Sequence, residues 1–363
     1  MIQKGYKFRI YPNEKQKDLI NKTFGCVRFV WNYWTDIFNN QKEGCYKRPK
    51  QFRDEFPWMK EVSFSPIRQR ERDFKALTKQ FFNPRRKKKI GRPQFKNKKG
   101  KQSYRLANNK FYIQGNKIRL EKIGFVTIKI DREISENLKL VNATISRDKV
   151  GDFYVSITVE QEVIKKAKTG KQVGLDVGLK SFVTQSDGVM VENPKYFRKS
   201  QSKVKKVQQH FSRKVKDSKS FNKARIKVAK VYRKIERQRR RFLHNLSNKI
   251  VTEFDVIAVE NLNVKGMTKN HSMAKSICDA SWAEFFRQLE YKSAWYGKEF
   301  IAVASPHTSQ TCSVCVYMSK ENRKTQEDFT CMRCGHHEHA DLNAAKFILI
   351  KSASVKAEFD ERL

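Results

Sequence analysis

Two Cys-x2-Cys pairs near the end of the sequence constrain the fold of this chain more than any other feature. Cys312 and Cys315 form the first pair, Cys331 and Cys334 form the second, and fifteen residues separate the pairs. Two such turns supply four thiolates to one tetrahedral Zn²⁺ ion and leave no coordination position for a substrate. Disulfides and unconnected core cysteines are the alternative, but paired Cys-x2-Cys at this interval favours one structural zinc ion.

Three carboxylates stand in sequence contexts that are unusual for charged side chains. Asp341 precedes the apolar helix of ADLNAAKFILI, a position where an aspartate is often only a helix cap. Asp176 lies within the apolar segment VGLDVGL, and Glu260 ends the apolar strand DVIAVEN. A carboxylate in a buried strand is costly unless it is paired or binds a metal ion. The three contexts together favour one shared site over three unrelated roles.

The order of predicted elements around these carboxylates is that of the ribonuclease H-like fold. In that fold Asp176, Glu260 and Asp341 converge and hold two Mg²⁺ ions ~3.5–4 Å apart, which activate water and stabilise the leaving oxygen of a phosphodiester. Mg²⁺ suits such a site because it prefers oxygen ligands and keeps positions for water and phosphate. The three histidines of residues 336–339 are expected on the surface or in support of these sites.

The charge of the chain indicates a polyanionic partner. Lysine and arginine number 78 against 37 acidic residues, a formal charge of +41, and nucleic acid is the partner that such an excess favours. No apolar run approaches the ~18 residues that a membrane span requires. The first residues, MIQKGYKFRIYP, lack the apolar core of a signal peptide, and the seven cysteines suit a reducing compartment, so we expect a prokaryotic cytoplasmic location.

The first half of the chain combines short strands with two helices. Residues 5–11 alternate apolar and polar side chains and predict a strand. Asn13 and Gln16 form a capping-box pattern at the start of one helix, and another is expected to start at Ser65-Pro66, with the serine as its cap and the proline in its first turn. Residues 104–160 read as short strands, which predict a small β-barrel that the N-terminal strand completes.

Basic segments interrupt this pattern and predict contacts with nucleic acid. Residues 83–103 read as a basic, low-complexity linker suited to phosphate contact, and residues 201–250 read as a basic helical pair. A solvated surface is the alternative for such side chains. The candidates for nucleic-acid contact are Lys7, Arg9, Arg28, Gln69, Arg70, Arg85, Arg86, Lys96, Arg239 and Arg240.

Several stretches of the sequence resemble TnpB proteins, which are transposon-encoded RNA-guided DNA nucleases related to the miniature type V CRISPR effectors. GLDVGL, AVENLNVKGM and the segment CSVC…CMRCG…ADLNAA resemble the three RuvC motifs and the zinc finger of that family. The likeness continues through KFRIYPNEKQ, GCVRFVWN, GRPQFK and SWAEFFRQLEYKSAWYG, so it covers nearly the whole chain.

The resemblance implies an α+β multidomain protein with a RuvC-like nuclease domain, an inserted zinc finger, a β-barrel wedge domain and a helical recognition lobe. It implies catalysis by Asp176, Glu260 and Asp341 and zinc binding by the four cysteines. The implied domains are residues 1–12 and 95–165 (wedge), 13–94 (recognition), 170–307 (nuclease), 308–338 (zinc finger) and 339–363 (C-terminal nuclease helix and tail).

The resemblance also implies the partners and the reaction. In such enzymes a guide RNA pairs with the target strand of double-stranded DNA and displaces the other strand, while the protein holds a short flanking motif. The helix from Ser65 would lie near that motif, with Gln69 as a candidate reader. We expect a monomer that cleaves DNA beside the motif by two-metal-ion hydrolysis. An RNA-guided repressor without cleavage and a strand-transfer transposase are the alternatives.

Two residues depart from the family pattern. Val316 follows the second cysteine where the family usually has glycine, so a different turn is expected in that knuckle. Phe347 replaces a common asparagine after the last motif. Neither departure affects a carboxylate. Some relatives have lost these acidic residues and act as repressors, and their retention here favours an active nuclease.

Overall fold

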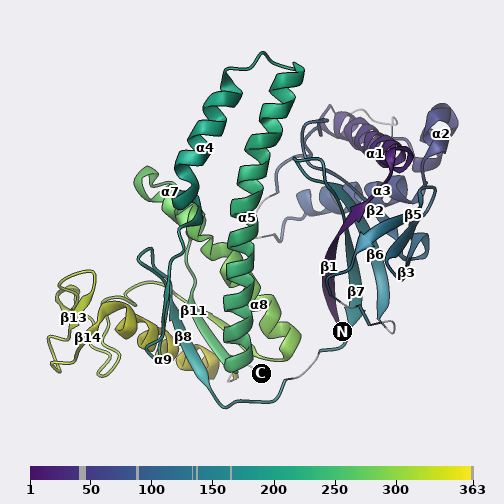
Figure 1. Cartoon of the computed structure of the whole chain (residues 1–363). Coiled ribbons are helices and arrows are strands. Elements are labelled where there is room, and N and C mark those ends of the chain that lie inside the picture. Colours follow the sequence, from purple (N-terminus) through teal and green to yellow (C-terminus); the bar gives the residue numbers. More distant parts are fainter. Residues whose placement is uncertain (41–45, 87–89, 133, 136–137, 164–165, 361–363) are drawn as a thin grey trace. The chain divides into compact units, whose positions relative to one another are not determined.

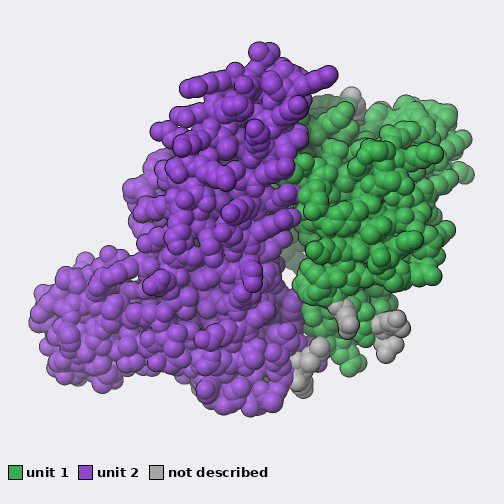
Figure 2. Space-filling view, viewed as in Figure 1, with its two compact units in different colours: residues 1–162 green, residues 163–363 purple. Residues whose placement is uncertain are grey.

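The computed structural model describes residues 1–363 except 41–45, 87–89, 133, 136–137, 164–165 and 361–363. The chain divides into two compact units, Met1–Glu162 and Val163–Leu363, which Figure 2 shows in different colours. The first unit contains a seven-stranded sheet, and the second contains a five-stranded sheet and a two-stranded one (Figure 1). No helix among the described residues is long and apolar enough to cross a membrane.

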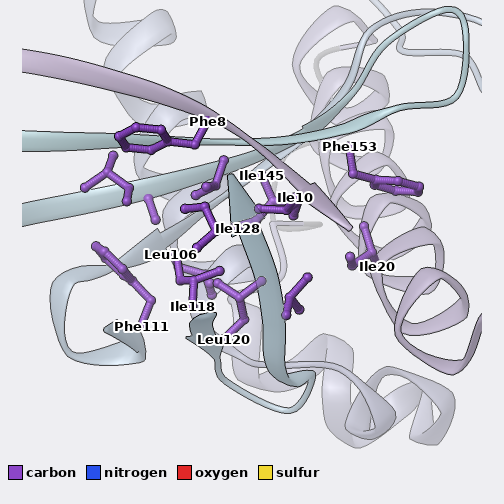
Figure 3. Close-up of a cluster of buried hydrophobic side chains, with 14 of the residues drawn as sticks. Phe8, Ile10, Ile20, Leu106, Phe111, Ile118, Leu120, Ile128, Ile145 and Phe153 are labelled. Atoms are coloured by element: carbon purple, nitrogen blue, oxygen red, sulfur yellow. The ribbon is translucent and has the colours of Figure 1, made fainter. Parts of the chain in front are cut away.

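The sheet of the first unit is an antiparallel half-barrel with the N-terminal strand near its middle. Its strand order is β2-β6-β7-β1-β5-β4-β3. The strands are β1 (Ile2–Tyr11), β2 (Gln102–Ala107), β3 (Phe111–Gln114), β4 (Lys117–Leu120), β5 (Gly124–Lys129), β6 (Lys139–Arg147) and β7 (Phe153–Gln161). Tyr6, Phe8 and Ile10 of β1 all belong to the buried core, as the alternation predicts. Figure 3 shows Phe8 and Ile10 in this core.

Helices of the first unit form a second, aromatic core. They are α1 (Glu14–Asn39), α2 (Pro49–Glu55) and α3 (Ser65–Phe81), with single 3₁₀ turns at Pro57–Glu61 and Asn108–Lys110. The predicted capping box of Asn13 and Gln16 is confirmed. Helix α3 begins at Ser65, but the prediction that Ser65 caps it is wrong, because Phe64 is the N-cap and no side chain among the described residues caps the helix. Trp34 of α1 is fully buried and its ring contacts Phe52 and Phe74, so the aromatic stripe of α1 serves packing.

Part of the segment predicted as a linker is held against α1. The Trp31 indole N–H donates to the carbonyl of Gln94 at 2.9 Å. The Asn32 side-chain amide donates to the carbonyl of Lys96 at 2.9 Å and accepts from its N–H at 2.8 Å. The side chain of Gln102 donates to three carbonyls between residues 97 and 100. The described residues 90–101 have no helix or strand, which agrees with a linker, but side chains of α1 and β2 bind part of their backbone.

The second unit is built on a mixed sheet with the order β10-β9-β8-β11-β12. Its strands are β8 (Gln172–Asp176), β9 (Ser181–Gln185), β10 (Met190–Glu192), β11 (Val256–Glu260) and β12 (Glu299–Val303). β8, β11 and β12 run parallel, whereas β9 is antiparallel to β8 and β10. Because β8 and β11 are parallel neighbours, their carboxyl ends meet at one edge of the sheet.

Helices cover this sheet. α4 (Tyr196–Ser212) and α5 (Lys219–Glu253) lie side by side and extend away from the sheet (Figure 1). The remaining elements are α6 (Val264–Met267), α7 (His271–Ala280), α8 (Trp282–Tyr296), a 3₁₀ turn at Lys320–Asn322, β13 (Asp328–Thr330), β14 (His337–His339) and α9 (Ala340–Asp360). A methyl group on Gly174 of β8 would lie 2.0 Å from the carbonyl oxygen of Ala345, so α9 packs directly on the β8 backbone.

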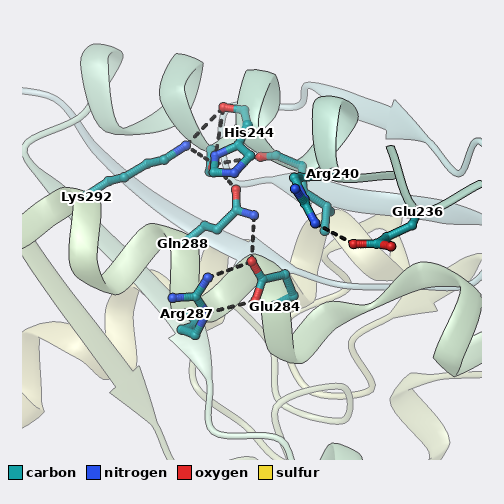
Figure 4. Close-up of polar contacts among 9 residues, drawn as sticks. Glu236, Arg240, His244, Glu284, Arg287, Gln288 and Lys292 are labelled. Carbon is teal, nitrogen blue, oxygen red and sulfur yellow. Dashed lines mark hydrogen bonds and ion pairs between the residues drawn. The ribbon is translucent and has the colours of Figure 1, made fainter. Parts of the chain in front are cut away.

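A buried lysine lies where α5 packs on α8. The Lys292 ammonium donates to the carbonyl of His244 at 3.0 Å and to the Ser247 hydroxyl at 2.6 Å (Figure 4). Gln288 accepts from Ser247 at 3.0 Å and donates to Glu284 at 2.9 Å. Burial lowers the pKa of Lys292 to about 8, although the charge of Glu284 opposes the shift.

Candidate functional site

The four cysteines converge, as their spacing predicts. Their sulfur atoms all lie within 4.8 Å of one another, with 3.8 Å between Cys312 and Cys334 and 3.5 Å between Cys315 and Cys331. A disulfide requires about 2.05 Å between sulfurs. Separations near 3.7 Å are what tetrahedral zinc with Zn–S bonds of about 2.3 Å requires. The cluster therefore suggests a zinc site.

Hydrogen bonds favour the thiolate form at Cys331, whereas the pKa values of Cys312 and Cys334 are raised. Burial raises the pKa of Cys331, but hydrogen bonds from the backbone N–H groups of Cys334 and Arg333 and from the thiols of Cys315 and Cys334 together lower it to about 6. A thiolate is the form of cysteine that ligates zinc. These hydrogen bonds therefore prepare Cys331 for a metal ion at neutral pH.

Both knuckles share one backbone turn, although only the second has glycine at its critical position. The N–H of Val316 donates to the carbonyl of Cys312 at 3.1 Å, and the N–H of Gly335 donates to that of Cys331 at 3.0 Å. The φ angles of Val316 and Gly335 are +60° and +71°. The prediction that the valine knuckle turns differently is wrong, because Val316 adopts the left-handed conformation that glycine adopts in the other knuckle.

A buried asparagine joins the cysteine site to α9. The Asn343 side chain accepts from the N–H of Ser313 and donates to the carbonyl of Thr311, both at 2.8 Å, and it is fully buried. Two hydrogen bonds to the first knuckle fix that knuckle against the first turns of α9. Sequence reasoning missed Asn343, although an amide on the apolar side of a helix is a signal that could have found it.

The structure brings the three predicted carboxylates together. Asp176 ends β8, Glu260 ends its parallel neighbour β11, and Asp341 lies in the first turn of α9, which packs on β8. All three residues are half-buried. Burial, followed by the charges of Glu260 and Asp341, raises the pKa of Asp176 well above its usual value. The site therefore concentrates negative charge at a place that remains partly open to solvent.

Two further residues contact the carboxylates, and sequence reasoning missed both. The Thr308 hydroxyl donates to Glu260, whose pKa is raised by burial. An Arg323 guanidinium nitrogen lies 3.4 Å from a carboxylate oxygen of Asp341. Arg323 belongs to the segment between the two cysteine pairs, so this segment also reaches the carboxylate site. Neither residue lies in a sequence motif, and only the folded structure brings them near the carboxylates.

Of the three histidines beside the second cysteine pair, two contact carboxylates and one accepts from a backbone N–H. His336 Nε2 lies 2.8 Å from Glu338, and His337 Nε2 lies 2.6 Å from Asp328. His339 Nδ1 accepts from the N–H of Asp341 at 3.2 Å. These contacts agree with the supporting roles that the sequence suggests.

In the first unit, three of the predicted nucleic-acid contacts line one cavity. Arg28, Arg70 and Lys96 surround it together with residues of the 95–103 segment. Arg9 instead forms an ion pair with Asp152 at 2.7 Å. The remaining candidates of this unit are Lys7, whose ammonium lies 4.6 Å from the ring centre of Tyr154, Gln69, which is half-buried, and Arg85 and Arg86, which are exposed.

In the second unit, both predicted contacts on α5 have acidic partners. Arg239 lies 2.7 Å from Asp279, which also accepts from the N–H of Phe197 at 3.0 Å and so joins α4, α5 and α7. Arg240 forms an ion pair with Glu236 one turn away (Figure 4). Contact of these arginines with nucleic acid stays a prediction.

Comparisons with known proteins decide the family. The chain is 31% identical over 370 residues to a "Putative RNA-guided DNA endonuclease" of Streptomyces pristinaespiralis, covering 98% of this chain and 91% of that protein. It is 30% identical over 380 residues to the "Putative RNA-guided DNA endonuclease InsQ" of Escherichia coli (strain K12), covering 97% and 93%. This chain belongs to the TnpB family.

Family models match most of this TnpB chain in three parts. A model described as a probable transposase matches residues 156–271, and a Cas12f1-like TNB domain matches residues 282–348. A model described as a helix-turn-helix domain matches residues 1–37. In the structure those residues form β1 and most of the single helix α1.

Solved structures show the fold of this TnpB chain. The structure "Cryo-EM structure of the Cas12f1-sgRNA-target DNA complex" aligns with a TM-score of 0.56 at 13% identity, over 96% of this chain and 98% of that one. The structure of a mini-RNA-guided endonuclease, CRISPR-Cas_phi3, aligns with a TM-score of 0.56 at 10% identity, over 97% and 92%. The chain therefore has a Cas12f1-like α+β fold with a half-barrel sheet.

Proposed function

We propose that this TnpB chain is an RNA-guided DNA endonuclease that cleaves target DNA beside a short flanking motif. The observation that carries the proposal is the convergence of Asp176, Glu260 and Asp341 around one partly open site. Relatives that share about a third of its residues over nearly its whole length bear the name of that activity. A protein that only bound nucleic acid would have no use for such a costly accumulation of negative charge.

The carboxylates suit Mg²⁺. Like charges that raise the pKa of Asp176 would be balanced by divalent cations, and carboxylate oxygens are the ligands that Mg²⁺ prefers. Among the described residues, only the cysteines form a group of metal-ligating side chains with donor atoms within 4.8 Å of one another.

The protein groups would position the reactants. Bound Mg²⁺ would supply the charge that activates water and stabilises the leaving oxygen of the phosphodiester. Asp176 and Glu260 stand on adjacent strand ends, which hold their carboxylates rigidly, and the Thr308 hydroxyl fixes one oxygen of Glu260. The guanidinium of Arg323 beside Asp341 is a second source of positive charge for a phosphate.

The sheet order supports the domain assignment that the sequence predicts. A ribonuclease H-like, RuvC-type domain is expected to begin with three antiparallel strands joined by hairpins and to continue with parallel strands. Residues 170–307 have this order, with β8, β9 and β10 followed by β11 and β12. The half-barrel of the first unit supports a wedge formed by residues 1–12 and 95–165, with α1–α3 as the recognition lobe. A guide RNA would read the DNA target by base pairing.

A charge-matched pair of variants tests the proposal. RNA that co-purifies with the wild type is sequenced, and matching DNA beside randomised flanks is offered with Mg²⁺. Asp176→Asn should abolish cleavage while guide and target binding persist. Asp187→Asn makes the same change at an exposed residue of the β9–β10 turn and should cleave normally. Normal cleavage by Asp176→Asn, or a wild type that binds RNA and DNA without cutting, would overturn the assignment.

A further inference from the structure

A cationic cavity lies within the first unit. It has a volume of about 420 Å³ and lies between α1, α3 and the start of β2. Phe24 and Val27 of α1, together with Phe95, supply its apolar side chains. No carboxylate is among its lining residues, whereas four cationic side chains are, namely those of Arg28, Arg70, Lys96 and Lys101. Such a concentration of one sign of charge around a concave site favours an anionic ligand.

The two arginines of the cavity are fixed in place but keep donors for a ligand. Arg28 Nη1 donates to the side-chain oxygen of Gln102 at 3.0 Å. Arg70 Nη2 donates to the carbonyl of Ser103 at 2.8 Å, and its Nη1 lies 3.5 Å from Asp73. A guanidinium has five N–H donors, so each arginine retains several. Planar donor pairs of this kind match the oxygens of a phosphate.

Lys96 completes the site. The hydrogen bonds of Asn32 hold the Lys96 backbone, and its ammonium lies 3.6 Å from the ring centre of Trp31. No oxygen in the described part of the chain accepts a hydrogen bond from this ammonium. Burial and the charge of Arg70 lower the pKa of Lys96 to about 8, with Asp73 opposing the shift and Lys101 adding to it. An anion in the cavity would supply the missing acceptor.

We propose that this cavity receives one phosphodiester group of a nucleic-acid strand, held by Arg28, Arg70 and Lys96, with the ring of Phe95 against the adjoining base. Phe95 lines the cavity and is 58% exposed, and exposed rings beside cationic grooves stack on unpaired bases. The proposal rests on the proposed function only in taking nucleic acid as the partner.

Binding by the full-length protein tests the site. The probes are a short fluorescent RNA, a DNA strand of the same sequence and its duplex, titrated over a range of salt concentrations. Lys96→Gln should weaken binding on the order of tenfold because a charge-assisted hydrogen bond is lost. It should also flatten the dependence of log K on log salt by about 0.7 for a single strand. Lys98→Gln removes the same charge from an exposed residue of the same segment outside the cavity and should change the affinity far less.

The pH dependence separates this contact from general attraction. Since Lys96 is half-deprotonated near pH 8 in the free protein, wild-type affinity should fall as the pH rises from about 7 to 9. Lys96→Arg should keep the affinity and lose this pH dependence. Lys98→Gln should keep the pH dependence. An effect confined to the RNA probe assigns the cavity to the guide, and one confined to DNA assigns it to the target.

Two results would overturn the assignment, and they are distinguishable. A wild type that binds and cleaves while Lys96→Gln behaves like Lys98→Gln would overturn the phosphate site alone. Wild-type protein that binds none of the three probes would overturn the proposed function together with the site. A measurement of unfolding at pH 7 checks that Lys96→Gln remains folded, which we expect because the backbone bonds of Asn32 do not involve the Lys96 side chain.

Discussion

The first zinc knuckle holds a β-branched residue in a backbone conformation that normally belongs to glycine. Val316 has a φ of +60°, and its side chain is 56% exposed. The left-handed conformation costs an L-residue about 1–2 kcal/mol because Cβ approaches the following carbonyl. We expect Val316→Gly to bind zinc more tightly than Val316→Ala, since both remove the valine methyl groups but only glycine removes Cβ.

The size of this difference follows from two opposing terms. Removing Cβ recovers about 1–2 kcal/mol. The glycine variant loses about 0.4–1 kcal/mol of this gain, because glycine has more conformational freedom than alanine in the unfolded chain. About 0.5–1 kcal/mol in favour of glycine remains. Because a zinc finger folds as it binds metal, this corresponds to a roughly two- to fivefold lower Kd for zinc.

Chelator competition measures the zinc Kd of each variant, and Val314 provides the matched control. Val314 lies in the same knuckle and is 65% exposed, but it is not among the residues with positive φ. There glycine should bind zinc more weakly than alanine, by about 0.5–1 kcal/mol. Gly335→Ala, at the corresponding position of the second knuckle, should also weaken zinc binding. Equal or weaker binding by Val316→Gly than by Val316→Ala would refute the strain argument.

Three other perturbations have defined outcomes. Gly174→Ala places a methyl 2.0 Å from the Ala345 carbonyl, so it should lower the free energy of unfolding by about 3 kcal/mol and reduce cleavage, as denaturant titration and cleavage rates would show. Asn343→Leu removes both hydrogen bonds to the first knuckle and should cost about 2–3 kcal/mol, measured as faster zinc loss to a chelator. Lys292 has a folded-state pKa of about 8, below its unfolded value, so stability should rise with pH between about 8 and 10.5. Lys292→Met should remove that rise in unfolding measurements and be more stable at pH 7, by up to about 3 kcal/mol.

Local patterns in the sequence predict the elements of this fold better than its long-range contacts. The capping box of Asn13 and Gln16, the start of α3 at Ser65 and the alternation in β1 all depend on neighbouring residues, and the structure confirms each. The composition of residues 94–101 indicates a linker, but it does not reveal the contacts that hold this segment. The bonds that hold it come from Trp31 and Asn32, more than sixty residues earlier, and no local pattern reveals such pairing.

The same distinction applies to the candidate site. The cysteine spacing and the contexts of the carboxylates can be read directly from the sequence. Thr308 and Arg323 could not be found in this way, since each acts through one side-chain contact across a loop. Val316 shows a further limit of prediction from sequence. The sequence reveals that valine replaces glycine, but only the structure shows that the turn is the same and that Val316 has a positive φ.

The contacts of α9 explain how a zinc site and a carboxylate site depend on each other. Gly174 lets α9 lie against the backbone of β8, which brings Asp341 toward Asp176. Two residues after Asp341, the side chain of Asn343 binds the backbone of the first knuckle. Arg323, from the segment between the cysteine pairs, returns to Asp341. A metal ion bound by the cysteines would therefore also restrain the helix turn and the guanidinium beside the third carboxylate. In this way a structural metal would contribute to the geometry of the site proposed for the catalytic ones.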